Sequence, residues 1–485
     1  MSHQDQDSGI VINHQDIKQV IDEFFPANLF ARKKPGQKGF WTSRWLAITA
    51  FLWVLSPKTG LIKAFGHARK ILGKMFRLPR EEGDSYQGFI KMLAKWHLRL
   101  MLTIPPQVRV KMKEKLPGQW EIEGFVVFAA DGSRIELCRT QSLQEAFAPQ
   151  RSQPTSRHTK KKSQQQKAQA RKARAGQRKK HKKQSAESRE KKAASPQMWL
   201  TMLWHVGSGL PWDWRKGPSD SSEREHLREM LCGLPENALI TADAGFVGYD
   251  LWKMLVDCKR HFVIRVGSNV RLLRKLGFAR EHDQTVYLWP DSAAKKKQPP
   301  LTLRLIVIHN GKHPLYLVTN ATKSRLSEAA AGRIYQARWG VELFFRTLKQ
   351  TFGRRKLRSR CPRCAELELD WSVLALWCVC LRGQMELLTA GEPPDRLSAA
   401  KALDAFQETL SDYRVRPETA SERLWSRLGC ALLDNYERSS SKESRNYPRK
   451  NQRKSPGIPE ITNATRDRII NARKIKKGNE IWLTA

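Results

Sequence analysis

The chain has 485 residues, 40% of them apolar, which is enough to bury a substantial core and to form about two or three domains. Its 88 Lys and Arg outnumber its 47 Asp and Glu, and the formal charge of +41 indicates a polyanionic partner. Nucleic acid is the usual partner of this kind, and an anionic membrane is the alternative. No apolar run approaches the ~18 residues that span a bilayer, since Trp45 to Leu55 is too short, and no secretory signal opens the chain. We therefore expect a cytosolic protein associated with the nucleoid.

Residues 1–118 have the pattern of a helical region. The stretch from Thr42 to Met75 contains two tryptophans and apolar faces with Arg or Lys between them. Amphipathic helices have this pattern, and so does a plain helical packing domain. The segment Trp45 to Leu55 is predicted to be a core helix.

Two short apolar strands are each followed by an aspartate. Gly124 to Leu137 begins as an apolar run, reaches Asp131-Gly132 and then alternates, which predicts a buried strand, a turn and a partner strand. Asp-Gly is also an ordinary hairpin turn, which is the alternative interpretation. Ala238 to Ala242 predicts the second strand, and Asp243 follows it directly.

The segment between these aspartates contains a long basic stretch. Residues Arg151 to Lys192 include seventeen Lys or Arg and two Glu, with much Gln, Ser and Ala and almost nothing apolar. Such a composition cannot bury a core, so we expect disorder in the unbound protein. Because phosphate neutralisation needs cations rather than structure, the simplest role for this loop is sequence-independent attraction to DNA.

Further elements alternate between strand and helix. Ser222-Glu-Arg-Glu225 is a capping box that predicts the start of a helix. A second helix is expected near Tyr249 to Val256. The strands expected on either side of these helices and farther along the chain are Gln197 to Val206, Ala238 to Ala242, His261 to Val266, Thr285 to Trp289, Leu301 to His309 and Leu315 to Thr319.

The segment from Tyr335 to Lys349 predicts a helix with two neighbouring faces. At about 100° per residue, Arg338, Glu342 and Lys349 fall within about 60° of Tyr335 around the axis. Apolar side chains occupy the adjacent arc, so one edge should pack into a core while the next presents a carboxylate, two cations and a phenol. A surface helix whose charges pair at four-residue spacing is the ordinary alternative.

The eight cysteines have no regular spacing and do not form a disulfide framework. Cys361-Pro-Arg-Cys364 resembles half of a zinc site, with Cys378 and Cys380 as the other half. The second pair, however, lies in an apolar run that predicts a buried helix, where free cysteine acts as a small hydrophobe. We therefore favour packing over zinc. A helical region is expected to about Leu433, followed by a second basic tail.

Taken together, these motifs resemble a known family. Tyr335, Arg338, Glu342 and Lys349 match every fixed position in the signature of the DDE transposases of insertion sequence family 4, bacterial elements that move by cut and paste. The resemblance implies an α/β fold with a ribonuclease-H-like catalytic core, a β-rich insertion and helical N- and C-terminal regions. The expected divisions are 1–118, DNA-end binding; 119–360, catalytic, interrupted by the basic loop 146–195 and the β-rich insertion 268–324; 361–433, helical; and 434–485, a basic tail.

The resemblance also implies the chemistry. Asp131, Asp243 and Glu342 would bind two Mg²⁺ ions, with Mn²⁺ as a substitute, and Asp131 would bridge them. The expected DNA contacts come from the signature residues Tyr335, Arg338 and Lys349, from Arg346 and Arg265, and from Trp289 as a residue that stacks on an unpaired base. Packing of Trp289 in the sheet is the alternative. The expected partners are the terminal inverted repeats of the element and target DNA, bound by a homodimer on paired ends.

Two other classes of protein share some of these features. A structure-specific nuclease on the same fold would have the three acids but would not join strands. A non-enzymatic basic DNA-binding protein would account for the charge, but it leaves Asp131, Asp243 and Glu342 without a role.

Overall fold

The computed structural model describes residues 16–30, 40–78, 85–148, 195–309, 314–415 and 457–483. The expected basic loop, Arg151 to Lys192, lies outside these ranges, as does much of the expected tail. Within the described ranges, no helix is both long enough and apolar enough to cross a membrane.

The described strands form one ten-stranded mixed sheet in the order β10-β6-β7-β8-β9-β5-β4-β1-β2-β3. The strands are β1 (Val126–Glu136), β2 (Gln197–His205), β3 (Leu210–Gly217), β4 (Ala238–Ala242), β5 (His261–Arg265), β6 (Arg271–Arg274), β7 (Thr285–Leu288), β8 (Leu301–Ile308), β9 (Leu315–Thr319) and β10 (Glu460–Asn463). The apolar runs that predicted β1, β2, β4, β5, β7, β8 and β9 therefore form strands at the expected places.

Half of this sheet has the expected ribonuclease-H-like arrangement. Strands β1, β4 and β5 are parallel neighbours, β2 is antiparallel to β1, and β3 is antiparallel to β2 at the edge. The turn expected at Asp131-Gly132 is wrong, because β1 continues through this dipeptide to Glu136. Asp131 pairs with Met202 and Gly132 with Thr201. The long strand β2 provides hydrogen-bonding partners along this whole length, which outweighs the local preference of Asp-Gly for a turn.

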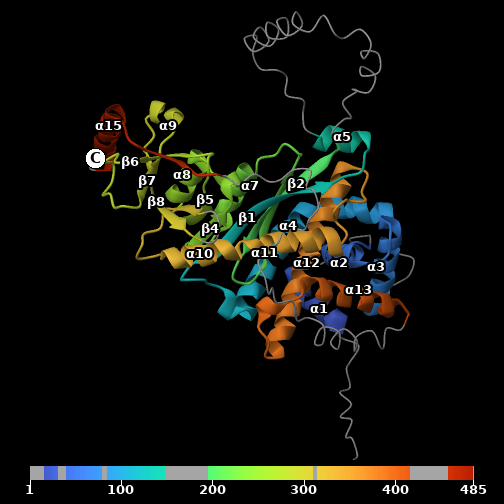
Figure 1. Ribbon diagram of the computed structural model, residues 1–485. Coiled ribbons are helices and arrows are strands. Elements are labelled where there is room, and N and C mark those ends of the chain that lie inside the picture. Colours follow the sequence, from blue (N-terminus) through green and yellow to red (C-terminus); the bar gives the residue numbers. More distant parts are fainter. Residues whose placement is uncertain are drawn as a thin grey trace, which may run out of the picture.

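The β-rich insertion extends the core sheet. Strand β9 runs antiparallel to β5, with Val263 opposite Thr319, and β8, β7 and β6 follow outward. The outermost strand, β10, comes from the expected basic tail and pairs parallel with β6. Figure 1 shows this end of the sheet together with the short helix α9 (Asp291–Lys295) and the C-terminal helix α15 (Arg466–Leu483).

Helices cover both faces of the sheet. One face carries α10 (Glu328–Ala337), whose Ile334 packs on Val127 of β1 and Val263 of β5. The opposite face carries α8 (Tyr249–Asp257), whose Trp252 packs against Phe262 of β5, and α7 (Glu223–Met230), which contacts β1, β2 and β3. The side chain of Ser222 caps α7, as the capping box predicted.

Most of the other helices lie together on the side of the sheet away from α15 (Figure 1), where α4 and α12 contact β3. They are α1 (Asp16–Phe24), α2 (Ser43–Leu55), α3 (Leu61–Phe76), α4 (Tyr86–Lys115), α5 (Gln141–Phe147), α12 (Pro362–Thr389) and α13 (Ala399–Val415). The long helix α12 contacts α2, α4, α13 and β3 and buries Cys378 and Cys380 in its packed surface. Cys361 precedes α12, and its sulfur accepts a hydrogen bond from the Cys364 backbone N–H. One core therefore contains helices from both parts of the chain, α1 to α4 and α12 to α13.

A buried polar cluster joins this block to the sheet. Asp370 of α12 is 3% exposed; it accepts hydrogen bonds from the Trp214 indole at 2.8 Å and from His97 Nε2 at 2.7 Å, and it pairs with Lys216. Burial alone would raise the pKa of Asp370, but Lys216 and His97 outweigh it and lower the pKa to about 2. The carboxylate is therefore ionised in the fold at neutral pH, with its charge compensated.

We expect Asp370→Asn to lower the free energy of unfolding by about 3 kcal/mol at pH 7, because it removes one partner of a buried ion pair and leaves the other uncompensated. A depressed carboxyl pKa stabilises the fold above the pKa of the unfolded chain, and this contribution is lost as the pH falls through the folded value. The difference in unfolding free energy between wild type and variant, measured by thermal unfolding, should therefore become smaller as the pH falls from about 4 towards 2. A loss of unfolding free energy that does not change with pH would contradict the role of Asp370 as an ionised, buried partner. So would a loss equal to that of the exposed control Asp395→Asn.

Candidate active site

Asp131 and Asp243 lie side by side where the pairing of the parallel strands β1 and β4 ends, although β1 itself continues to Glu136. The register pairs Ala130 of β1 with Ala242 of β4, so the next residue on each strand is one of these aspartates. Asp243 also caps the short 3-10 helix η5 (Ala244–Phe246), and its carboxylate accepts a hydrogen bond of 2.8 Å from the Gly245 backbone N–H. The parallel pairing therefore brings together two acids that are separated by more than a hundred residues of sequence.

The third acid approaches from α11 (Trp339–Arg346), which contacts β1. Arg338 precedes α11 and lies between Glu342 and Asp131. Its Nη2 is 3.0 Å from Glu342 Oε1, and its Nη1 is 3.8 Å from Asp131 Oδ2. The side chains of Arg338, Asp131 and Glu342 are 11%, 19% and 28% exposed. Both carboxylates therefore share one largely buried cation.

The helix that carries the signature is less regular than expected. Helix α10 ends at Ala337, α11 begins at Trp339, and the π-helical turn η6 (Thr347–Thr351) follows. Despite these changes of pitch, Lys349 Nζ donates to Ser133 Oγ of β1 at 2.6 Å. The Arg338 guanidinium carbon lies 5.6 Å from the centre of the Tyr335 ring. The structure therefore places the signature residues along one line beside β1.

The packing of α11 depends on a glycine. A Cβ atom at Gly340 would lie 3.1 Å from the indole nitrogen of Trp204 on β2, tighter than ordinary van der Waals contact. The ring of Phe344, one turn later, packs 5.1 Å from the ring of Trp204. This close approach holds α11 against the sheet and fixes the position of Glu342.

A fourth carboxyl group, that of Glu223, faces the same aspartates, and the sequence analysis did not single it out. Burial, followed by Asp131 and Asp243, raises the pKa of Glu223 to about 7, and Arg134 opposes this rise. Burial also raises the pKa of Asp131 to about 6; Arg338 opposes this rise, while Asp243 and Glu342 add to it. Burial lowers the pKa of Lys349. The site thus concentrates negative charge that Arg338 only partly compensates.

The donor set suits a hard divalent cation. Carboxylate oxygens are preferred ligands of Mg²⁺ and Mn²⁺, and such ions usually keep several waters in addition to one or two carboxylates. Among the described residues, no three His, Cys, Asp or Glu side chains converge closely enough to hold an ion in this conformation. Arg338 lies between Asp131 and Glu342. The Arg338 guanidinium must therefore turn away before these two acids can share an ion.

The other residues expected to contact DNA differ in accessibility. Trp289 is 3% exposed, and its indole N–H donates to the Gln298 carbonyl at 2.9 Å. The guanidinium of Arg468 from α15 lies 5.3 Å from the Trp289 ring. These contacts favour the packing interpretation of Trp289 over stacking on a base. Arg265 is half-buried on β5, and Arg346 is exposed at the end of α11.

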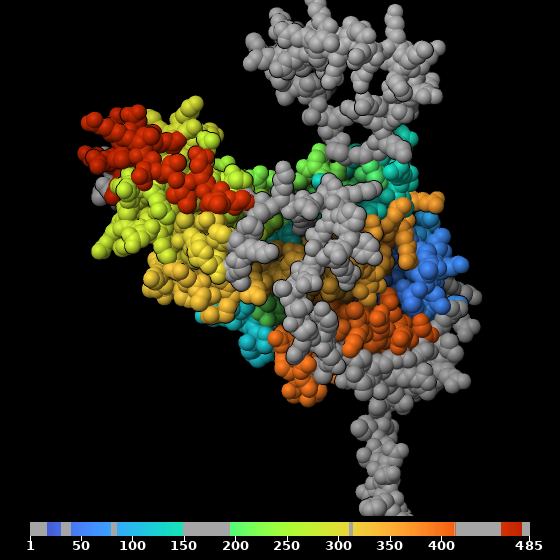
Figure 2. Space-filling view, in the orientation of Figure 1, coloured from blue at the N-terminus to red at the C-terminus, as the bar shows by residue number. Residues whose placement is uncertain are grey.

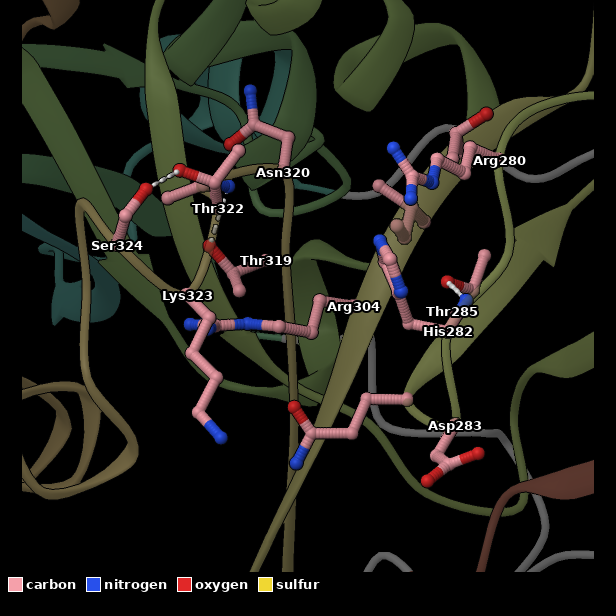
Figure 3. Close-up of a pocket in the computed structure, with 14 residues that line it drawn as sticks. Arg280, His282, Asp283, Thr285, Arg304, Thr319, Asn320, Thr322, Lys323 and Ser324 are labelled. Carbon is pink, nitrogen blue, oxygen red and sulfur yellow. Dashed lines mark hydrogen bonds between the residues drawn. The ribbon is translucent and has the colours of Figure 1, made fainter.

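A cavity of about 740 Å³ lies elsewhere, in the β-rich half of the sheet. Figure 3 shows Arg280 and His282 on one side of it, Lys323 and Ser324 on the other, and Arg304 between them. None of the three acids lines it. Its cations and hydroxyl groups suit phosphate oxygens better than they suit a metal ion.

Comparisons with known proteins agree with this geometry. A domain profile described as Transposase DDE domain matches residues 123–378, which include all four carboxylates of the site. The chain is 32% identical over 170 residues to the transposase InsG for insertion sequence element IS4 of Escherichia coli (strain K12), an alignment that covers 33% of this chain. It is 30% identical over 143 residues, 27% of this chain, to the putative transposase y4zB of Sinorhizobium fredii (strain NBRC 101917 / NGR234). The chain spans 37% and 39% of the lengths of these two relatives.

A solved structure, a piggyBac transposase synaptic complex with hairpin DNA, shares 13% sequence identity with the chain. The comparison covers 91% of this chain and 90% of that one, with a TM-score of 0.35.

Proposed function

Since this chain belongs to the DDE transposase family, we propose that it catalyses cut-and-paste transposition of an insertion sequence. Water would first attack the phosphodiester at each end of the element and release a 3′ hydroxyl, and that hydroxyl would then attack target DNA. The observation that carries this proposal is the meeting of Asp131 and Asp243, where the pairing of β1 with β4 ends, with Glu342 on α11. These acids lie within the region that matches the family.

The carboxylates of Asp131, Asp243 and Glu342 would hold two divalent ions, Mg²⁺ in preference. When bound, such ions stabilise the attacking and departing oxygens of an in-line displacement at phosphorus. The protein's own part is to hold the carboxylates in position. The strand register fixes Asp131 beside Asp243, and the packing of Gly340 on Trp204 fixes the helix that carries Glu342.

The cations beside the acids would hold the DNA backbone. Arg338 compensates Asp131 and Glu342 in the present conformation. If the guanidinium turns outward, it gains access to a phosphate next to the cleaved bond, where its fork can bind two oxygens. Lys349 and Tyr335 lie along the same line and would bind further phosphates. These contacts would position the DNA and carry no sequence information.

The partners we propose are the terminal inverted repeats and target DNA, bound by a homodimer on paired ends. The formal charge of +41 supports a polyanionic partner. The exposed Arg346 and the half-buried Arg265 are further candidates for contacts with the backbone, as is the cavity lined by Arg280, Arg304 and Lys323. After cleavage, the free 3′ hydroxyl would attack the opposite strand and form a hairpin. Water would then open the hairpin and release the hydroxyl again, and that hydroxyl would join target DNA.

A strand-transfer assay tests this proposal against the two other functions. Purified protein is incubated with labelled DNA carrying the element's ends and with a plasmid, and the products are separated by size. Label joined to the plasmid supports a transposase. Cleavage without joining supports a structure-specific nuclease, and DNA binding without either product supports a non-enzymatic DNA-binding protein.

The metal requirement gives a second test. We expect activity with Mg²⁺ or Mn²⁺, and we expect Ca²⁺ to support binding without turnover because its looser coordination misplaces the reacting oxygens. Cleavage and DNA affinity should be measured separately in each ion. Full cleavage in EDTA would rule out the proposed role of the carboxylates, since their function depends on a bound cation.

A further inference from the structure

We infer that Glu223 is a fourth carboxylate of the active site, which would bind a divalent cation together with Asp131 and Asp243. Because no three acids among the described residues converge closely enough in the present conformation, binding requires these side chains to turn toward the ion. This inference rests on the proposed function, because it adds a ligand to the site that performs it. Glu223 is the first residue of α7, on the face of the sheet opposite to α11.

The position of Glu223 depends on the absence of a side chain at residue 132. Successive residues of a strand point to opposite faces, so Gly132 faces α7 while Asp131 faces α11. A Cβ atom at Gly132 would lie 2.7 Å from Glu223 Cδ and 2.9 Å from Cγ, closer than real Cβ contacts. The Glu223 side chain therefore fills the space that any other residue at 132 would occupy, directly beside Asp131.

The same carboxyl group also reaches the second aspartate. A Cβ atom at Gly245 would lie 3.5 Å from Glu223 Oε2 and 2.9 Å from Asp243 Oδ1. Gly245 also donates its backbone N–H to Asp243. Glu223 and Asp243 thus lie against one glycine, so α7 brings a carboxylate to the place where the pairing of β1 with β4 ends.

Pairing distinguishes Glu223 from the other glutamates of α7. Glu225 forms an ion pair with Arg228, and Glu229 forms one with Arg215. Glu223 makes no hydrogen bond or ion pair with any described residue. The carboxylates of Asp131 and Asp243 act on it more strongly than the nearby cation Arg134 does. A carboxylate that is half-buried and faces two others is unfavourable without a cation between them.

An acid in the first turn of a helix also has an ordinary role, because it interacts favourably with the helix dipole. Glu225 occupies the same turn, is exposed and fulfils that role while paired with Arg228. It is therefore the matched control for Glu223. A dipole effect predicts similar results for the two residues, whereas a cation site predicts that only Glu223 affects metal binding.

The test uses the full chain, without DNA, and Mn²⁺ as the probe. Titration calorimetry and Mn²⁺ electron paramagnetic resonance should show at least about a tenfold loss of affinity in Glu223→Gln, a typical effect of removing a carboxylate at a metal site. Glu225→Gln should bind Mn²⁺ as the wild type does. Mn²⁺ affinity in Glu223→Gln within twofold of wild type would overturn the inference.

Thermal unfolding separates a cation site from a structural role. In EDTA, Glu223→Gln should be at least as stable as the wild type, because it removes repulsion from Asp131 and Asp243. In Mn²⁺ the wild type should gain more in Tm than the variant, since a ligand stabilises the state that binds it. A variant that loses stability equally in EDTA and in Mn²⁺ would show that Glu223 serves packing alone.

Gly132→Ala provides a second variant that leaves the carboxyl group in the chain. The added methyl group should displace the end of the flexible Glu223 side chain and weaken Mn²⁺ binding as Glu223→Gln does. Normal Mn²⁺ affinity in Gly132→Ala would contradict the inference. Because Mn²⁺ binding is measured without DNA, a wild type that binds Mn²⁺ through Glu223 and yet joins no strands would refute only the proposed function.

Discussion

Alanine at Asp131, Asp243 or Glu342 should reduce DNA cleavage by at least about 10³-fold, because a metal ligand at a phosphoryl-transfer site supplies several kcal/mol of transition-state stabilisation. DNA affinity should stay within a few-fold of wild type, since affinity comes mainly from cations that contact phosphates. The two quantities are measured separately, cleavage by single-turnover assay at saturating DNA and affinity by titration.

Glu225→Ala is the control, because it removes an exposed carboxylate of α7 that pairs with Arg228. The variants should remain folded. Removing one acid from a cluster of negative charge reduces repulsion, and Arg338 keeps one carboxylate partner in both Asp131→Ala and Glu342→Ala. Cleavage within a few-fold of wild type in any of the three variants would remove that residue from the catalytic set.

The parts of the site that sequence could predict depend on local pattern. An apolar run followed by an aspartate predicts a strand end, and this holds for β4 with Asp243. The spacing of Tyr335, Arg338, Glu342 and Lys349 is a property of one helical segment, so it can be recognised without knowing the tertiary fold. The meeting of Asp131 and Asp243 followed from the fold that the family resemblance implies, and the sheet has β1 and β4 as parallel neighbours.

The parts that could not be predicted depend on contacts between distant segments. Asp131-Gly132 has the local preference of a turn, and only the ladder with β2 keeps it extended. Glu223 looks like an ordinary acid in a capping box until α7 packs over Gly132. The Asp-Gly pair did contain a signal, since a glycine inside a strand often marks a close approach by another group. Asp-Gly is also a favoured turn sequence, so the pattern alone does not distinguish a turn from a close approach.

The C-terminal segment gives a second example. Its composition predicts a basic tail, yet β10 adds a strand to the sheet and Arg468 of α15 covers Trp289. Arg468 also donates to the Trp289 carbonyl at 2.8 Å and pairs with Asp291. These contacts join segments almost 180 residues apart, and neither segment carries a local pattern that would identify its partner.

Replacing the basic segment 151–192 by a Gly-Ser linker of the same length should weaken DNA binding for all sequences alike. The segment carries seventeen Lys or Arg against two Glu. Each lost phosphate contact removes about 0.9 from the slope of log affinity against log salt on duplex DNA, so the loss of about six contacts would reduce the slope by about 5. Cleavage at saturating DNA should continue, because none of Asp131, Asp243 and Glu342 lies in the segment.

A same-length segment with the order of its residues scrambled is the matched control, because it keeps every charge. If the segment acts through charge alone, the scrambled chain should bind like the wild type, both to the element's ends and to random DNA. If the segment instead folds on the terminal repeat and reads its bases, scrambling should lower affinity for the element's ends and leave random DNA unaffected. Affinities for both DNAs, measured across a salt series for the three proteins, decide between these roles. A loss confined to the element's ends would contradict the electrostatic interpretation.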